Sequence, residues 1–97
     1  MRILFTPTGH RQFFEAIAYI YKDNPAAASD FRRKTEQKLS RLKAFPESGR
    51  VILEFPDLPF REVIVRPYRF FYRLKEDAVW IVAVWHGAQL PEEPERK

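Results

Sequence analysis

The sequence predicts an α+β domain in which a hairpin of two helices packs on one face of a small antiparallel β-sheet. Three observations predict it. A short apolar run at residues 3–6, ILFT, is stopped by Pro7 and suits a strand. Residues 8–44 then hold two stretches with helical spacing, and four runs rich in aromatic and β-branched residues follow. Helices followed by strands favour separate layers of helix and sheet.

The first helix is expected over residues 8–23, where apolar residues recur every three or four positions, at Phe13, Phe14, Ile17, Ile20 and Tyr21. Asn24 can cap the next helix and Pro25 suits its first position. That second helix is expected to reach about residue 44 and to end at FPESGR, residues 45–50. Because the link is short, the two helices are expected to lie antiparallel.

Four further strands are expected at VILEF (51–55), FREVIVR (60–66), YRFFYRL (68–74) and AVWIVAVWH (78–86). Turn residues separate them, and the last two strands are expected to form a hairpin that turns at Glu76-Asp77. Residues 1–90 are therefore expected to form one domain, and residues 91–97 a flexible tail.

Alternation of side chains assigns two faces to this last hairpin. The first face is almost wholly apolar and is expected to meet the helices; it holds Phe70, Tyr72, Leu74, Val79, Ile81, Ala83 and Trp85. The second holds Arg69, Phe71, Arg73, Trp80, Val82, Val84 and His86. Arg69 and His86 are thus expected to point the same way, onto a surface that the helices leave uncovered.

The sequence does not decide which side chains of residues 60–66 share the face of Arg69. A tight turn at Pro67 places Glu62, Ile64 and Arg66 beside Arg69, whereas a bulge there exchanges them for Arg61, Val63 and Val65. In either case the second face is apolar and rimmed with arginine. Such a face suits an extended peptide, a groove on a protein or stacked nucleotides. The expected binding face comprises Arg61, Glu62, Arg69, Phe71, Arg73 and Trp80.

The amino-acid composition favours some kinds of binding partner and excludes some kinds of chemistry. Seventeen basic residues oppose 13 acidic ones, a net charge of +4, which favours an acidic protein, nucleic acid or the ribosome as partner. The absence of cysteine excludes disulfides and thiolate chemistry, and with two histidines neither a metal site nor a cofactor is expected. No run approaches about 20 apolar residues, so we expect no membrane contact and a cytoplasmic protein.

Five short motifs carry a resemblance. They are NP-x-A-A at 24–28, FP-x-x-GR at 45–50, RE-V at 61–63, Y-R-x-x-Y at 68–72 and the terminal strand that ends in His86. Their order and spacing resemble the RelE/ParE superfamily of toxins from type II toxin–antitoxin modules, over about residues 3–89. The resemblance implies a small basic toxin silenced by a cognate antitoxin. Its fold, a helical hairpin on a twisted antiparallel sheet, agrees with the one expected above.

The superfamily divides into two mechanisms. ParE-like members poison DNA gyrase, whereas RelE-like members cut mRNA on the ribosome as metal-independent endoribonucleases. In the nuclease branch, the resemblance implies that Arg69 stabilises transition-state charge on phosphate and that His86 is a general acid. The alternatives are purely structural roles. Arg69 and Arg73 would then form ion pairs on the sheet face, and His86 would be an ordinary histidine at the end of a strand.

Departures from the nuclease pattern favour the ParE side. Where nuclease members have two lysines on the preceding strand, this chain has Phe60 and Glu62, and a carboxylate opposite Arg73 suits an ion pair. Where many have a Tyr or Arg after the last strand, it has Gly87-Ala88-Gln89. We therefore expect a gyrase-poisoning toxin. The alternatives are an mRNA endoribonuclease and a degenerate member that only binds.

Overall fold

The computed structural model of the chain describes residues 1–87. Its elements are, in order, β1 (Arg2–Phe5), α1 (Pro7–Asp23), α2 (Pro25–Ser40), the 3₁₀ turn η1 (Arg41–Lys43), β2 (Arg50–Val51), β3 (Arg61–Val65), β4 (Tyr68–Lys75) and β5 (Ala78–His86). The expected tail at 91–97 lies outside the described residues.

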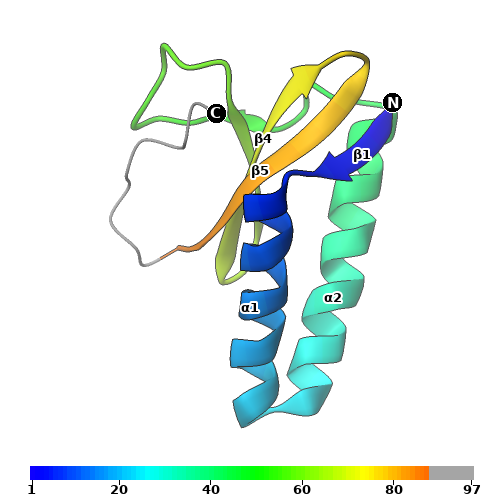
Figure 1. The fold of residues 1–97 in the computed structure, drawn as a ribbon, viewed down its shortest axis with the longest axis vertical. Coiled ribbons are helices and arrows are strands. Elements are labelled where there is room, and N and C mark those ends of the chain that lie inside the picture. The colour runs from blue at the N-terminus through cyan, green and yellow to red at the C-terminus, as the bar shows by residue number, and fades with distance from the viewer. Residues whose placement is uncertain (88–97) are drawn as a thin grey trace.

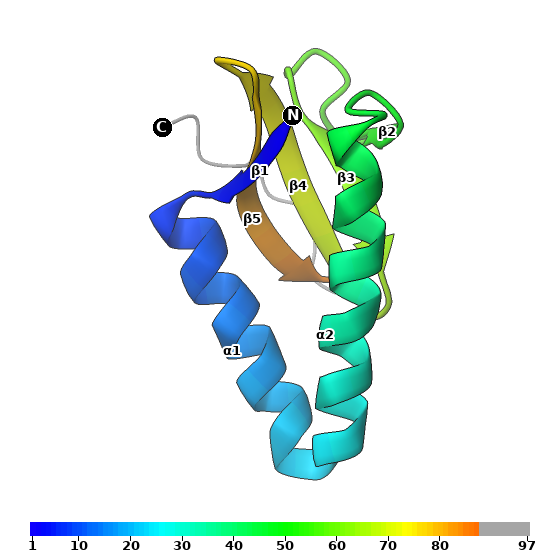
Figure 2. The same cartoon turned by 90° about the vertical axis from the view of Figure 1, so that its right-hand side faces the viewer.

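The strands form one sheet in the order β1-β5-β4-β3-β2. The α1–α2 hairpin covers one face of it and extends beyond its edge (Figures 1 and 2). The expected α+β class is thus confirmed. The sheet is mixed rather than wholly antiparallel, because β1 runs parallel to β5 while the other neighbours pair antiparallel.

Both helices start where side-chain caps were available. The Thr6 hydroxyl accepts a hydrogen bond from the Gly9 N–H at 3.1 Å, and the Asn24 amide oxygen accepts one from the Ala27 N–H at 3.1 Å. Proline follows each cap at the first helical position. The Thr6 N–H also donates to the Ile81 carbonyl, so a single residue docks α1 on the end of β1 and on β5.

The sequence predicts a strand over residues 51–55, and this prediction is wrong beyond Val51, because β2 comprises only Arg50–Val51. Residues 52–60 instead form a loop with two successive turns, in which the Phe55 N–H donates to the Ile52 carbonyl and the Leu58 N–H to the Phe55 carbonyl. The first of these turns already begins at Ile52, directly after the strand, and Pro56 and Pro59 further on lack the N–H groups that a return to the ladder would need.

This loop covers the face of the sheet that the helices leave free. Its apolar side chains form a second, smaller core against the sheet; the cluster contains Ile52, Phe55, Leu58, Phe60, Phe71, Val82, Ala83 and Trp85. The main core lies on the other side, between the sheet and both helices, and includes Phe31 and Tyr72. The helices leave the second face free, as expected, but the loop of the same chain covers part of it, where the sequence had suggested a binding partner.

A one-residue bulge in β5 changes which residues share a face. Phe71 lies opposite Ala83 but Tyr72 lies opposite Ile81, so Val82 is an extra residue. The hairpin turns at Glu76-Asp77 as expected, with positive φ at both residues. Beyond the bulge, however, Val84 joins the helix-side core and Ala83 joins the second core, the reverse of the expected parity.

Tyr72 links the core to the segment that follows η1. Its hydroxyl donates to the Pro46 carbonyl at 2.8 Å and accepts from the Gly49 N–H at 2.9 Å. The ring is fully buried, and burial raises the pKa of the hydroxyl. A Cβ added at Gly49 would lie 2.3 Å from this hydroxyl, so the glycine is what permits the contact.

We predict that Tyr72→Phe lowers the free energy of unfolding by about 1–3 kcal/mol, because it leaves two polar backbone groups without their partner. Urea denaturation measures this. Tyr21→Phe, an identical change at an exposed ring, is the control and is expected to change stability by less than about 0.5 kcal/mol. Equal effects of the two changes would contradict the account.

Candidate functional site: an arginine held between two carboxylates

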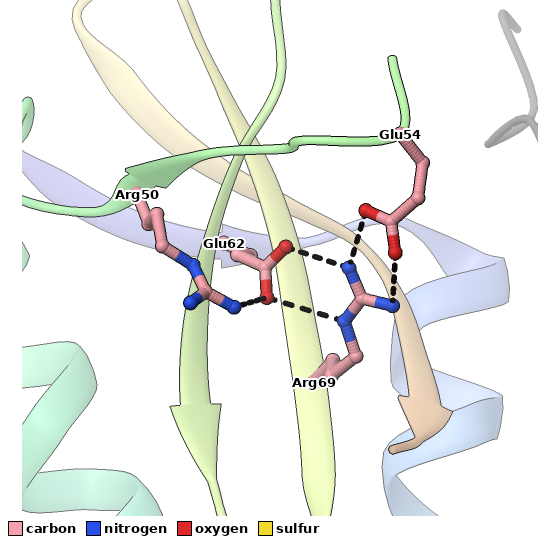
Figure 3. A network of polar contacts seen from close by, with 4 residues as sticks. All are labelled: Arg50, Glu54, Glu62 and Arg69. Carbon is pink, nitrogen blue, oxygen red and sulfur yellow. Dashed lines mark hydrogen bonds and ion pairs between the residues drawn. The ribbon is translucent and has the colours of Figure 1, made fainter. Parts of the chain in front are cut away.

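Arg69 lies at the centre of a network of four charged side chains (Figure 3). One edge of its guanidinium meets Glu62, with Nε 3.1 Å from Oε1 and Nη2 2.7 Å from Oε2. The other edge meets Glu54, with Nη1 3.1 Å from Oε2 and Nη2 3.0 Å from Oε1. Arg50 donates from Nη2 to Glu62 Oε1 at 3.0 Å. Both contacts of Arg69 are therefore bidentate.

Strand register explains how the network assembles. Arg69 lies opposite Ile64, and Glu62 is two positions along β3, so their side chains project from the same face. Arg50 lies directly opposite Glu62 on β2. Glu54 arrives from the loop at 52–60. Of the two parities left open by the sequence, the tight-turn one is confirmed for Glu62 and Ile64.

Burial separates an inner from an outer carboxylate. The Glu62 side chain is 1% exposed and that of Arg69 is 12% exposed, whereas the Glu54 side chain is 32% exposed. The carboxylate of Glu62 raises the pKa of Arg69, and the hydrogen bonds from Arg69 lower the pKa of Glu54. Two positive and two negative charges balance, which offsets part of the cost of burying them.

His86 does not share a face with Arg69. It lies opposite Tyr68, whose ring belongs to the helix-side core, while Arg69 lies opposite Trp85. The imidazole packs edge-on against the Tyr68 ring at 5.3 Å between centroids. The expectation that Arg69 and His86 point the same way is therefore wrong, and the bulge in β5 is the reason.

The other expected binding residues are mostly engaged within the chain. Phe71 is buried, with the Arg69 guanidinium 5.0 Å from its ring centroid. Arg73 and Trp80 lie opposite each other on the expected face, with the Arg73 guanidinium 5.8 Å from the Phe60 ring. The Arg73 Nε and Trp80 Nε1 atoms are buried and have no hydrogen-bond partner among residues 1–87.

Two of the expected assignments need correction. Arg61 lies opposite Tyr72, on the helix side of the sheet, and donates to the Gly49 carbonyl at 2.9 Å. It therefore does not belong to the face of Arg69. The expected ion pair of Glu62 exists, but its partners are Arg69 and Arg50 rather than Arg73.

Sequence reasoning missed Glu54 and Arg50. Glu54 fell inside a run read as a strand, where alternation assigns it no partner, and Arg50 preceded that run. The two prolines after Glu54 were the available signal that the chain leaves the sheet there.

A hollow of about 560 Å³ opens beside the outer edge of Arg69. Arg50, Arg66, Arg69 and Glu54 contribute its charged lining, and Leu53, Ile64 and Tyr68 contribute apolar walls. His86 also reaches its rim, from the opposite face of β5. Across the part of the chain that the structure describes, no three His, Asp or Glu side chains gather as a metal site would require.

Comparisons with known proteins identify the family. The model of the ParE toxin of the type II toxin–antitoxin system, parDE, matches residues 3–91. The chain therefore belongs to the ParE toxin family, within the superfamily that its motifs resemble. None of the curated proteins matched.

A solved structure supports the fold. A chain of the chromosomal ParDE toxin–antitoxin system from P. aeruginosa superposes with a TM-score of 0.68. The match is 18% identical in sequence and covers 89% of this chain and 95% of that one. Within residues 1–87, no helix has the length and apolar character needed to cross a membrane.

We predict unequal costs for removing the two carboxylates. Glu62→Gln is expected to lower the free energy of unfolding by about 3 kcal/mol, because it leaves Arg69 partly buried without its inner partner. Glu54→Gln, the matched change at the more exposed group, is expected to cost about 0.5–1 kcal/mol. Denaturant unfolding at pH 7 measures both, and equal losses would contradict the inner and outer assignment.

The lowered pKa of Glu54 predicts how stability depends on pH. A carboxyl whose pKa is depressed by folding stabilises the protein above its unfolded pKa, and that stabilisation is lost as the pH falls through the folded pKa. The stability difference between the native chain and Glu54→Gln should therefore be full at pH 7 and shrink as the pH falls below about 4. A difference independent of pH would refute this role. Asp30, whose pKa is also lowered, is common to both proteins and cancels.

Proposed function

We propose that this chain is the toxin of a type II module and stops growth by binding and poisoning DNA gyrase, acting in the cytoplasm. The match to the ParE family over residues 3–91 is the observation that carries the proposal. Its departures from the nuclease pattern at Phe60 and Glu62 point the same way.

The arrangement of Arg69 argues against mRNA cleavage. A nuclease needs a guanidinium aimed at the scissile phosphate and an acid on the same side of it. Here both edges of Arg69 are occupied by carboxylates, and His86 projects from the other face of the sheet. Among the described residues, His86 does line the hollow beside Arg69, but it extends from the opposite face of β5.

A cognate antitoxin is the second part of the proposal. The similar structure comes from a ParDE toxin–antitoxin system, and a net charge of +4 suits an acidic inhibitor. Induction of this chain alone is expected to stop growth, and a short acidic protein encoded beside it is expected to restore growth when expressed together with it.

We predict that the purified chain inhibits supercoiling of relaxed plasmid by DNA gyrase and leaves ribosome-bound mRNA intact. Because a basic protein can also coat DNA, relaxation of the same plasmid by topoisomerase I is the control and should proceed normally. Gel electrophoresis of the plasmid and primer extension on the mRNA measure the two outcomes. Intact gyrase activity together with mRNA cut on the ribosome would overturn the proposal.

A further inference from the structure

The two carboxylates that bind the Arg69 guanidinium differ in how easily another group could displace them. Glu62, on the inner edge, comes from a strand and its side chain is 1% exposed, so exchange would require the packing over this face of the sheet to move. Glu54, on the outer edge, comes from the loop at 52–60 and is 32% exposed. Its carboxylate can leave by rotation of its own side chain. The outer edge of Arg69 is therefore the exchangeable one.

The hollow beside that edge has an excess of positive charge once Glu54 leaves. Arg50, Arg66 and Arg69 line it, and Glu54 is the single acidic side chain among the described lining residues. The buried carboxylate of Glu62 forms ion pairs with both Arg50 and Arg69 and so offsets one of their two positive charges. Arg66 is exposed at the end of the β3–β4 hairpin and takes no part in the network of Figure 3. An incoming anion would thus find Arg66 exposed, and Arg69 beside it once Glu54 has left.

We propose that this hollow binds a carboxylate side chain from an acidic peptide segment of a protein partner, which replaces Glu54 on the outer edge of Arg69. Glu54 then acts as an internal competitor that occupies the site while the partner is absent. The inference deepens the proposed function and rests on it, because the acidic segment would belong to the protein that controls the toxin.

Geometry favours a carboxylate over a nucleic-acid phosphate. The outer edge already holds a planar carboxylate through two parallel hydrogen bonds, a shape that a second carboxylate reproduces. The apolar walls at Leu53, Ile64 and Tyr68 suit aliphatic side chains next to the acidic one. A phosphate chain needs a track of cations, whereas this hollow is short and has a buried carboxylate beneath it.

The test is an NMR titration of the full chain with three probes. They are the peptide acetyl-Glu-Leu-Glu-amide, its uncharged analogue acetyl-Gln-Leu-Gln-amide, and the dinucleotide pUpU. The acidic peptide is expected to shift the backbone resonances of Arg66 and Arg69, and the analogue is expected to shift neither. Tighter binding of pUpU at these residues, or no binding of the acidic peptide, would overturn the inference.

Two variants distinguish displacement of Glu54 from the general effect of removing one negative charge from the protein. Glu54→Gln should tighten binding of the acidic peptide by about tenfold if Glu54 fills the site nine-tenths of the time. Glu36→Gln makes the same charge change on the exposed side of α2 and should alter binding by less than about twofold. Equal gains for the two variants would contradict an exchange at Arg69.

Loss of binding is tested at Arg66. Replacing Arg69 itself would leave the buried Glu62 carboxylate without its main ion-pair partner and could unfold the protein. Arg66→Gln should weaken binding several-fold, whereas Arg33→Gln, an exposed arginine on α2, should not; the reverse order would refute the site. These titrations use neither gyrase nor ribosomes. A failed exchange therefore leaves the gyrase proposal standing, and a failed gyrase assay leaves the exchange intact.

Discussion

The structure depends on one ionic contact, the guanidinium of Arg69 clamped between Glu62 and Glu54. The contact joins β4 to β3 and ties both strands to the loop that closes the second face of the sheet. A carboxylate as buried as that of Glu62 is tolerable only when it is paired and hydrogen-bonded, and its bidentate contact with Arg69 meets that condition. The residue that the resemblance marked as catalytic is thus the one that the fold has most completely paired.

The bulge at Val82 has an equally large consequence. Side chains alternate with a period of two, so one extra residue reverses the face of every residue that follows it in the strand. It moves His86 to the side of Tyr68 and Ala83 into the second core. The sheet thereby keeps the superfamily's Arg and His in sequence but sets them on opposite faces.

Local patterns were enough to predict most of the fold. Helical spacing, the cap at Asn24 and the turn at Glu76-Asp77 are set by neighbouring residues. Alternation alone left open whether Glu62 or Arg61 shares the face of Arg69, because the geometry of the turn at Pro67 decides it. The bulge could not be predicted, because it satisfies the packing of both cores at once and leaves no mark in the residues around Val82. The loop at 52–60 was misread because its apolar residues resemble a strand, although they pack on the sheet instead of pairing with it.

Hydrogen exchange at the Nε–H of Arg69 is the measurement that tests this account most directly, since that proton lies in the bond to Glu62. In ¹⁵N NMR at pH 7, we expect its exchange with water to be slowed by at least about tenfold relative to the exposed Arg11, because it is bonded and shielded from solvent. Exchange as fast as that of Arg11 would mean that Arg69 is not held by the buried carboxylate, and would contradict the account.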